Sequence, residues 1–196
     1  MSGLLGSYNT RGEVSFPRVT EILAAVGLGP DFSTVPPDVL EAARVRGRAV
    51  HNAIEAIVYD FLDESALAPD VLTRLDSYRR FVKESGYETV HTEIEVEHPV
   101  WRYRGHPDTI GWLLNKRTLL DWKNTDAVQL APASYQLAAY RAAWNAQHPT
   151  EPVEALGVVQ LKSDGTYRFH EVSAAEAEPV WFAAVTVYRA QKGHES

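Results

Sequence analysis

Apolar residues in the first part of the chain recur at three- and four-residue spacing, which predicts helices. A short helix is expected to open at Pro17, with Thr20 as its N-cap, and to stop before Gly27. A second, long helix begins at Pro36 and Pro37, and its apolar stripe extends over residues 39–62. A third helix covers about residues 70–84 and ends at Gly86. All three predicted helices precede the first predicted strand.

Gly47 lies inside the predicted second helix. A helix is about 1 kcal/mol less stable with glycine than with alanine at an interior position. The glycine therefore predicts a break in the helix, or the close approach of another group.

The pattern changes period after Gly86. Residues 89–97 alternate, which is typical of one half-buried strand with Glu93 and Glu95 on the same side. Further strands are expected at residues 103–114, 118–123, 155–161 and 167–172, with residues 115–117 as a hairpin turn and residues 163–165 as another turn. Helices are expected at residues 133–147 and 174–191. This order predicts one α/β domain around a mixed sheet, with a helical part at 17–86 and a sheet part at 88–192.

Composition narrows the class of protein. The chain has 196 residues, enough for one domain with a full core, and no repeat or linker indicates a second domain. It contains no cysteine, which excludes disulfides, cysteine-ligated zinc and an iron–sulfur cluster, and indicates an intracellular protein. No signal-like or membrane-spanning stretch is expected. The net charge of -7 excludes broad charge-driven coating of nucleic acid, so DNA binding would need a local basic patch and a metal.

Three charged residues carry the strongest chemical signal. Asp108 and Asp121 come from predicted neighbouring strands, and Lys123 shares a strand face with Asp121 because side chains alternate with period two. Two carboxylates so placed can hold a divalent cation next to a water and a phosphate. The alternatives are a turn carboxylate for Asp108 and a strand-end salt bridge for the other two. The apolar neighbours of Asp121 favour a buried strand, where an unpaired carboxylate is costly.

Other polar residues are weaker candidates. His51 shares a helix face with Gly47, and imidazole is a natural ligand in a manganese or magnesium site, although a lone histidine is more often structural. Glu93 and Glu95 are possible additional ligands or water-orienting groups, or else a solvated acidic face. Gln136 and Tyr140 share a helix face and belong either to the site or to an amphipathic boundary.

In order along the chain, four segments resemble the motif set of the PD-(D/E)XK nuclease superfamily, and most closely its RecB-type exonuclease branch. They are residues 47–51 (GRAVH), 105–108 (GHPD), 121–123 (DWK) and 136–140 (QLAAY), and residues 17–23 provide a phage-like opening. The resemblance implies an αβββαβ core of the restriction-endonuclease type behind the helical region. The lack of cysteine departs from the iron–sulfur members of the branch.

The resemblance also implies roles. His51, Asp108, Asp121 and the backbone carbonyl of Trp122 would bind Mg²⁺ or Mn²⁺, and Lys123 would position or activate the attacking water. Gln136 and Tyr140 would support the site and the DNA strand. These roles describe a metal-dependent DNA nuclease of the exonuclease kind that acts on DNA with free ends in recombination and repair.

The charge pattern adds a path for DNA and leaves two alternatives. Basic residues of the helical half form the expected entrance: Arg44, Arg46, Arg48, Arg79, Arg80 and Lys83. Among the aromatic residues, Trp101, Tyr103 and Tyr135 are candidates for stacking on bases or for core packing. The alternatives are an inactive nucleic-acid-binding module of the same fold and a metallohydrolase of small phosphoesters.

Overall fold

The computed structural model describes residues 7–8 and 14–193, with side chains from residue 16 onward. The helices are α1 (Val19–Ala25), α2 (Pro37–Val58), the short 3-10 helix η1 (Glu64–Ala66), α3 (Pro69–Ser85), α4 (Leu130–Gln147) and α5 (Ala174–Gly193). The strands are β1 (Ser7–Tyr8), β2 (Val14–Ser15), β3 (Glu88–Thr92), β4 (Val96–Glu97), β5 (Arg104–Gly105), β6 (Thr109–Leu113), β7 (Lys116–Lys123), β8 (Ala155–Leu161) and β9 (Tyr167–Val172). No helix in this part of the chain is both long and apolar enough to cross a membrane.

The main sheet has five strands in the order β3-β6-β7-β8-β9. β7 and β8 are parallel, and the other neighbours are antiparallel, so the predicted mixed sheet is confirmed. The two parallel strands are connected through α4, as parallel pairing requires a crossover. β7 occupies the centre, with β6 on one side and β8 on the other.

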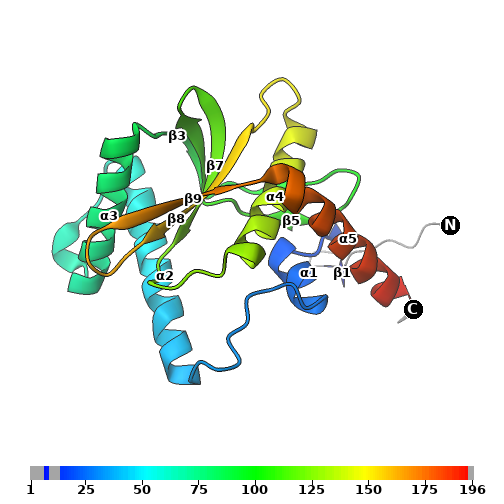
Figure 1. The fold of residues 1–196 in the computed structure, drawn as a ribbon, viewed down its shortest axis with the longest axis horizontal. Helices are drawn as coiled ribbons and strands as arrows, with labels where there is room; N and C mark the ends of the chain where they lie inside the picture. Colours follow the sequence, from blue (N-terminus) through cyan, green and yellow to red (C-terminus); the bar gives the residue numbers. More distant parts are fainter. Residues whose placement is uncertain (1–6, 9–13, 194–196) are drawn as a thin grey trace.

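Helices cover both faces of this sheet (Figure 1). On one face α2 and α3 pack through a core that includes Phe81 and Trp122. On the other face α1, α4 and α5 enclose a core that includes Leu137 and Trp181. Adjacent residues of β7 alternate between the two cores, since Leu119 belongs to the second and Leu120 to the first. The central strand is therefore buried from both sides.

The helices begin and end near their predicted positions, with three corrections. Thr20 lies inside α1, whose N-cap is Arg18, so the predicted cap is wrong. α2 runs without a break through Gly47, so the predicted interruption is also wrong. The helix ends at Val58, and Phe61, which the apolar stripe included, lies beyond it and is exposed. Gly86 ends α3, as predicted, and it does so in the left-handed conformation.

The strand predictions need more correction. Residues 89–97 do not form one strand, because the β3–β6 register shifts between Thr89 and His91 and the strand stops at Thr92. The bulge moves Val90 to the solvent, although Thr92, which alternation assigned to the same face, is buried. Residues 103–114 likewise divide into β5 and β6, and Asp108 precedes β6 instead of lying within a strand. The hairpin turn to β7 is formed by Leu114 and Asn115, both with positive φ, one residue earlier than predicted.

Gly111 and Gly47 allow a matched test of this packing. A Cβ on Gly111 in β6 would lie 2.2 Å from the carbonyl oxygen of Glu88 in the neighbouring strand, whereas a Cβ on Gly47 meets no atom within 4 Å. We expect Gly111→Ala to lower the free energy of unfolding by roughly 1–3 kcal/mol. Gly47→Ala should raise it by roughly 0.5–1 kcal/mol, because the helix is continuous there. Urea denaturation measures both, and a Gly111→Ala variant as stable as wild type would contradict the β3–β6 pairing.

Candidate metal centre and its surroundings

The site is built where β3 and β6 separate. The ladder between them ends at the pair Thr92 and Thr109. One residue further on each chain stand Glu93 and Asp108, and the carbonyl of Asp108 accepts hydrogen bonds from the Glu93 N–H (3.1 Å) and the Thr92 hydroxyl (3.0 Å). Glu93 has a φ of +48°, which turns the chain out of the strand. These contacts fix both acidic residues beside each other.

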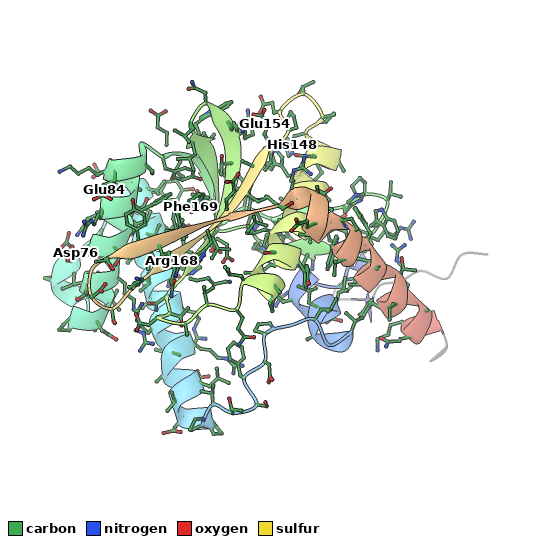
Figure 2. All side chains as sticks on the ribbon, viewed as in Figure 1. Asp76, Glu84, His148, Glu154, Arg168 and Phe169 are labelled. Carbon is green, nitrogen blue, oxygen red and sulfur yellow. The ribbon has the colours of Figure 1, made fainter. Side chains whose placement is uncertain are left out.

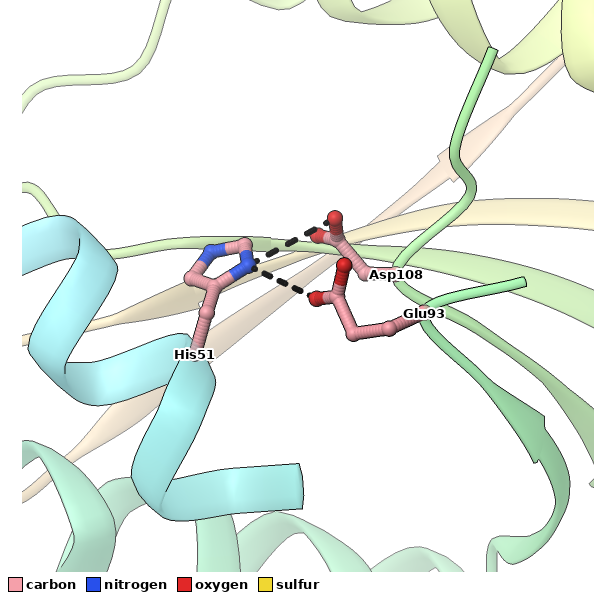
Figure 3. A group of neighbouring side chains, drawn as sticks. All are labelled: His51, Glu93 and Asp108. Carbon is pink, nitrogen blue, oxygen red and sulfur yellow. Dashed lines mark ion pairs between the residues drawn. The ribbon is translucent and has the colours of Figure 1, made fainter. Parts of the chain in front are cut away.

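His51 extends from the helix α2 toward Glu93 and Asp108, which lie at the ends of the sheet strands (Figure 3). Its Nδ1 atom lies 3.5 Å from a carboxylate oxygen of Glu93 and 3.5 Å from one of Asp108. One ligand atom from each of the three residues lies within 4.8 Å of the others, the only such group among the described histidine and acidic residues. The structure thus brings together His51 and Asp108, as predicted, and adds Glu93 from the two weaker glutamate candidates.

The backbone of Trp122 connects this group to β7. Its N–H donates to Oδ2 of Asp108 at 2.7 Å, and its carbonyl oxygen lies 3.0 Å from Nε2 of His51. Because the β6–β7 ladder stops at Thr109 and Leu120, the Asp108 carboxylate takes the position of the next strand partner. The carbonyl predicted as a ligand therefore lies next to His51, but at the ring nitrogen opposite to the one that faces Glu93 and Asp108.

Asp121 and Lys123 form a pair next to the centre. The Lys123 ammonium group lies 2.9 Å from the Asp121 carboxylate, which confirms that the two side chains share one face of β7. Asp121 is buried in the central strand and is not a member of the group around His51. Burial lowers the pKa of Lys123, but the carboxylates of Asp121 and Asp108 raise it more, so the ammonium stays charged.

The electrostatics of the centre indicate an excess of negative charge. The carboxylate of Asp108 raises the pKa of His51 to about 9 against the effect of burial, and the contact with Glu93 adds to the shift. Burial raises the pKa of Asp108 itself to about 6, with His51 opposing and Asp121 assisting that shift. Both raised pKa values mean that the centre favours added positive charge. A divalent cation would supply this charge, and the carboxylate and imidazole groups are suitable ligands for it.

Gln136 and Tyr140 meet on one face of α4. The Gln136 amide donates to the Tyr140 hydroxyl at 2.8 Å. The Tyr140 ring fills the place of a side chain at Gly105, where a Cβ would lie 2.1 Å from a ring carbon. Burial raises the pKa of Tyr140, and the charges of Asp108 and Asp121 add to that effect. The pair supports the β5–β6 connection that carries Asp108.

Two cavities open on either side of His51. The first, of about 350 Å³, lies between α2, the loop after β7 and the start of α4, and its lining includes Arg44, Lys123 and Gln136. The second, of about 380 Å³, lies along the other side of α2 and includes Arg48 and Glu93. The side chains of Arg44 and Arg48 are more than half exposed, and both lie near Glu41, at 3.9 and 3.4 Å.

Several candidates lie away from the centre. Glu95 pairs with Arg104 at 3.1 Å, so it does not share the position of Glu93 as the single-strand prediction implied. Arg79 and Arg80 are on α3, line neither cavity, and are paired with acidic residues that include Asp76 and Glu84, which Figure 2 shows at the outer edge of that helix.

Two of the aromatic candidates for base stacking also lie away from the centre. Tyr103 is fully buried and donates its hydroxyl hydrogen to the Ala139 carbonyl, so it is a core residue. Trp101 packs against Phe182 and Arg189 and also lies away from the cavities.

Sequence reasoning missed Thr92 and Asn124. Thr92 holds the Asp108 carbonyl, and Asn124 follows Lys123 directly in the lining of the first cavity. The position of Asn124 next to the DWK segment is a signal that the sequence contains. Nothing in the sequence marks Thr92, because its role depends on the end of the β3–β6 ladder.

No protein-family model and no curated protein matches the chain. Solved structures do match. A candidate exonuclease from Eubacterium rectale aligns with 87% of this chain and 71% of its own, at 8% identity and a TM-score of 0.52. An alkaline exonuclease from Laribacter hongkongensis, LHK-Exo, aligns over 63% of this chain at 15% identity and a TM-score of 0.45, and its complex with dAMP over 68% at 16% and 0.44. This chain covers 66% of the first of these two chains, just under two thirds, and 71% of the second.

At such identities the likeness is one of fold. The Eubacterium rectale structure supports it over most of the chain. The helices on both faces of a mixed sheet, with the order of elements that the motifs require, agree with it. The chain therefore has a mixed α/β fold, with helices on both faces of a five-stranded sheet, that the Eubacterium rectale structure shares.

Proposed function

We propose that this protein is a divalent-metal-dependent DNA nuclease that acts as an exonuclease. The observation that carries the proposal is the meeting of His51, Glu93 and Asp108 beside the Asp121–Lys123 pair. The fold shared with a candidate exonuclease supports the same activity.

The spacing of the donor atoms suits a small cation. Adjacent ligands of an octahedral Mg²⁺ at about 2.1 Å lie about 3 Å apart. Nδ1 of His51 is 3.5 Å from each of two carboxylates, close to that value before any ion draws the ligands inward. His51, Asp108 and Glu93 would hold the ion, with Asp121 as a further oxygen donor, while the Trp122 carbonyl, at the other ring nitrogen of His51, would orient the imidazole. The imidazole favours Mn²⁺ over Ca²⁺, which prefers more ligands, all of them oxygen.

The bound metal would polarise the scissile phosphate and lower the pKa of the attacking water. The protein supplies the rest. Lys123, held by Asp121 at 2.9 Å, presents a charged donor that can orient the water or a phosphate oxygen. Burial of Asp121 keeps this donor fixed. Gln136 and Tyr140, which are hydrogen-bonded to each other, would support the β5–β6 connection that carries Asp108.

The arginines of α2 provide the local positive charge that an acidic protein needs for DNA. Arg44 lines the first cavity and Arg48 the second, so a strand that passes His51 would meet a guanidinium group on each side. Their only ion-pair partner among the described residues is the exposed Glu41. Exposed pairs of this kind are weak and can exchange for phosphate contacts.

Digestion of end-labelled linear DNA and closed circular DNA, each single- and double-stranded, with and without Mg²⁺ or Mn²⁺, tests the proposal. We expect metal-dependent loss of linear DNA, while closed circles remain intact because they offer no terminus. Rapid cutting of closed circles would instead identify an endonuclease, and no cleavage with either metal would refute the proposed function.

Asp121→Ala and Lys123→Ala should each lower the cleavage rate by about a hundredfold or more while the protein stays folded. The reason is that the two side chains form one unit on the face of β7 that adjoins the centre. Asp76→Ala, which removes an exposed carboxylate of α3, is the matched control and should cleave normally. Near wild-type cleavage by a folded Asp121 or Lys123 variant would remove these residues from the mechanism.

Metal binding should distinguish the two glutamates. We expect His51→Ala and Glu93→Gln to weaken Mn²⁺ binding by about tenfold or more, and to do so far more than they weaken DNA binding. Glu95→Gln and His106→Ala are the controls, because these two residues lie beside each other, 3.9 Å apart, and outside the group around His51. Calorimetry gives the affinities. Unchanged Mn²⁺ binding by His51→Ala would make this histidine a structural residue.

The double variant Arg44→Ala/Arg48→Ala should bind DNA more weakly without any base preference. Each lost phosphate contact reduces the slope of log affinity against log salt by roughly one unit. Arg79→Ala/Arg80→Ala removes the same charge from α3 and should leave the slope unchanged. Anisotropy titrations over a range of salt concentrations measure it, and equal slopes for wild type and the α2 variant would place the DNA path elsewhere.

A further inference from the structure

The first cavity has a lining that the proposed reaction does not explain. Beyond the charged residues at its edge, it has largely apolar walls contributed by the loop before α2, by α2 itself, by the segment before α4 and by the first turn of α4: Phe32, Leu40, Ala43, Val128, Pro132 and Ala133. Its volume of about 350 Å³ is that of a small-molecule site. Metal and phosphate need no apolar wall.

Asn124 contributes a polar group to this cavity. It follows Lys123 at the end of β7, and both its amide nitrogen and its amide oxygen are buried without a hydrogen-bond partner among the described residues. Leaving a donor and an acceptor unsatisfied together destabilises a folded protein, so such groups are rare in native structures. An occupant of the cavity would satisfy both atoms.

Gly47 forms part of the opposite wall. The helix is regular at this position, and no neighbouring atom requires a glycine, since a Cβ would meet nothing within 4 Å. The fold would therefore be better served by alanine. The absent side chain instead leaves open the space between α2 and the loop that carries Asn124.

The two free atoms of Asn124 decide what kind of group fits. A phosphate would satisfy the amide N–H₂ group but would repel the amide oxygen, and a cation would do the reverse. The edge of a nucleobase carries a donor and an acceptor side by side, and its flat faces suit apolar walls. We propose that this cavity receives one unpaired nucleobase of the DNA substrate and that Asn124 pairs with the edge of that base.

The base pocket rests on the proposed function, because it requires DNA at the adjoining centre. His51, Trp122 and Lys123 line the same cavity, so a strand with one base in the pocket has its backbone beside the candidate metal group. The pocket would fix which phosphodiester lies there. A base in the pocket would also provide the hydrogen-bond partners that the side-chain amide of Asn124 lacks among the described residues.

Binding of short single-stranded oligonucleotides to the metal-free protein tests the pocket without any cleavage. A series that carries one abasic site at successive positions is titrated by fluorescence anisotropy. For wild type we expect one position at which loss of the base weakens binding by about ten- to hundredfold, the size of a bidentate amide–base contact. Asn124→Leu should bind the intact oligonucleotide as weakly as wild type binds the oligonucleotide that lacks the critical base. Removal of that base should not weaken the binding of Asn124→Leu any further.

Two more variants keep the result interpretable. Gly47→Leu should fill the cavity and have the same effect as Asn124→Leu, although it leaves the amide in place. Gln191→Leu also replaces a side-chain amide by leucine, at an exposed position of α5 that lines neither cavity, and should keep the abasic profile of wild type. Thermal denaturation should show Asn124→Leu to be at least as stable as wild type, because it removes two unsatisfied buried atoms.

The outcomes separate the two proposals. Failure of wild type to cleave intact DNA with either metal refutes the nuclease but not the base pocket, which the metal-free titration measures. An abasic profile without a sensitive position, a profile that Asn124→Leu leaves unchanged, or absence of oligonucleotide binding overturns the pocket. If wild type cleaves DNA and any one of these three results is found, the proposed nuclease activity stands and the proposed base pocket does not.

Discussion

The peptide group of Trp122 is the point on which the arrangement of the centre depends. Its N–H is bonded to the Asp108 side chain, and its carbonyl contacts His51. These two contacts connect the central strand, the start of β6 and the long helix α2, three segments that are far apart in the sequence. Because a backbone group in a central strand has very little freedom, it holds the flexible ends of both side chains at fixed positions. A displacement of β7 would separate the histidine from the carboxylate.

The position of this peptide follows from the burial of β7. Apolar residues on both faces of the strand, such as Leu119 and Leu120, hold it between two helical layers. Asp121 lies in the same strand and would be costly to bury alone, and Lys123 compensates its charge directly. A strand that is buried on both faces thus also carries the Asp121–Lys123 ion pair. Stability and chemistry depend on the same segment.

Several local features of the chain weaken the fold and occur around the centre. Glu93 adopts a positive φ, Gly47 occupies the interior of a helix, and the Asn124 amide is buried without partners. Each of these is unfavourable by itself, and their concentration around one point is typical of functional sites. Other positions follow local preference, as at Gly86, where a helix ends in the left-handed conformation, although Leu114 in the β6–β7 turn also has a positive φ.

The sequence by itself determined the order of helices and strands, the central position of residues 118–123, and the shared face of Asp121 and Lys123. These follow from the period of apolar residues and from the alternation of a strand, which are local properties of the chain. The order of four short motifs also predicted that His51 and Asp108 belong to one site, and the structure brings the two side chains together.

Only the tertiary structure decided between Glu93 and Glu95. Alternation assigned them the same side, but the bulge at Val90 and the end of the ladder at Thr92 directed Glu93 to His51 and left Glu95 with Arg104. The separation of the arginines of α2 from those of α3, and the isolation of Asn124, likewise depend on which surfaces the helices present. Such features come from pairing and packing between distant segments, and no local pattern encodes them.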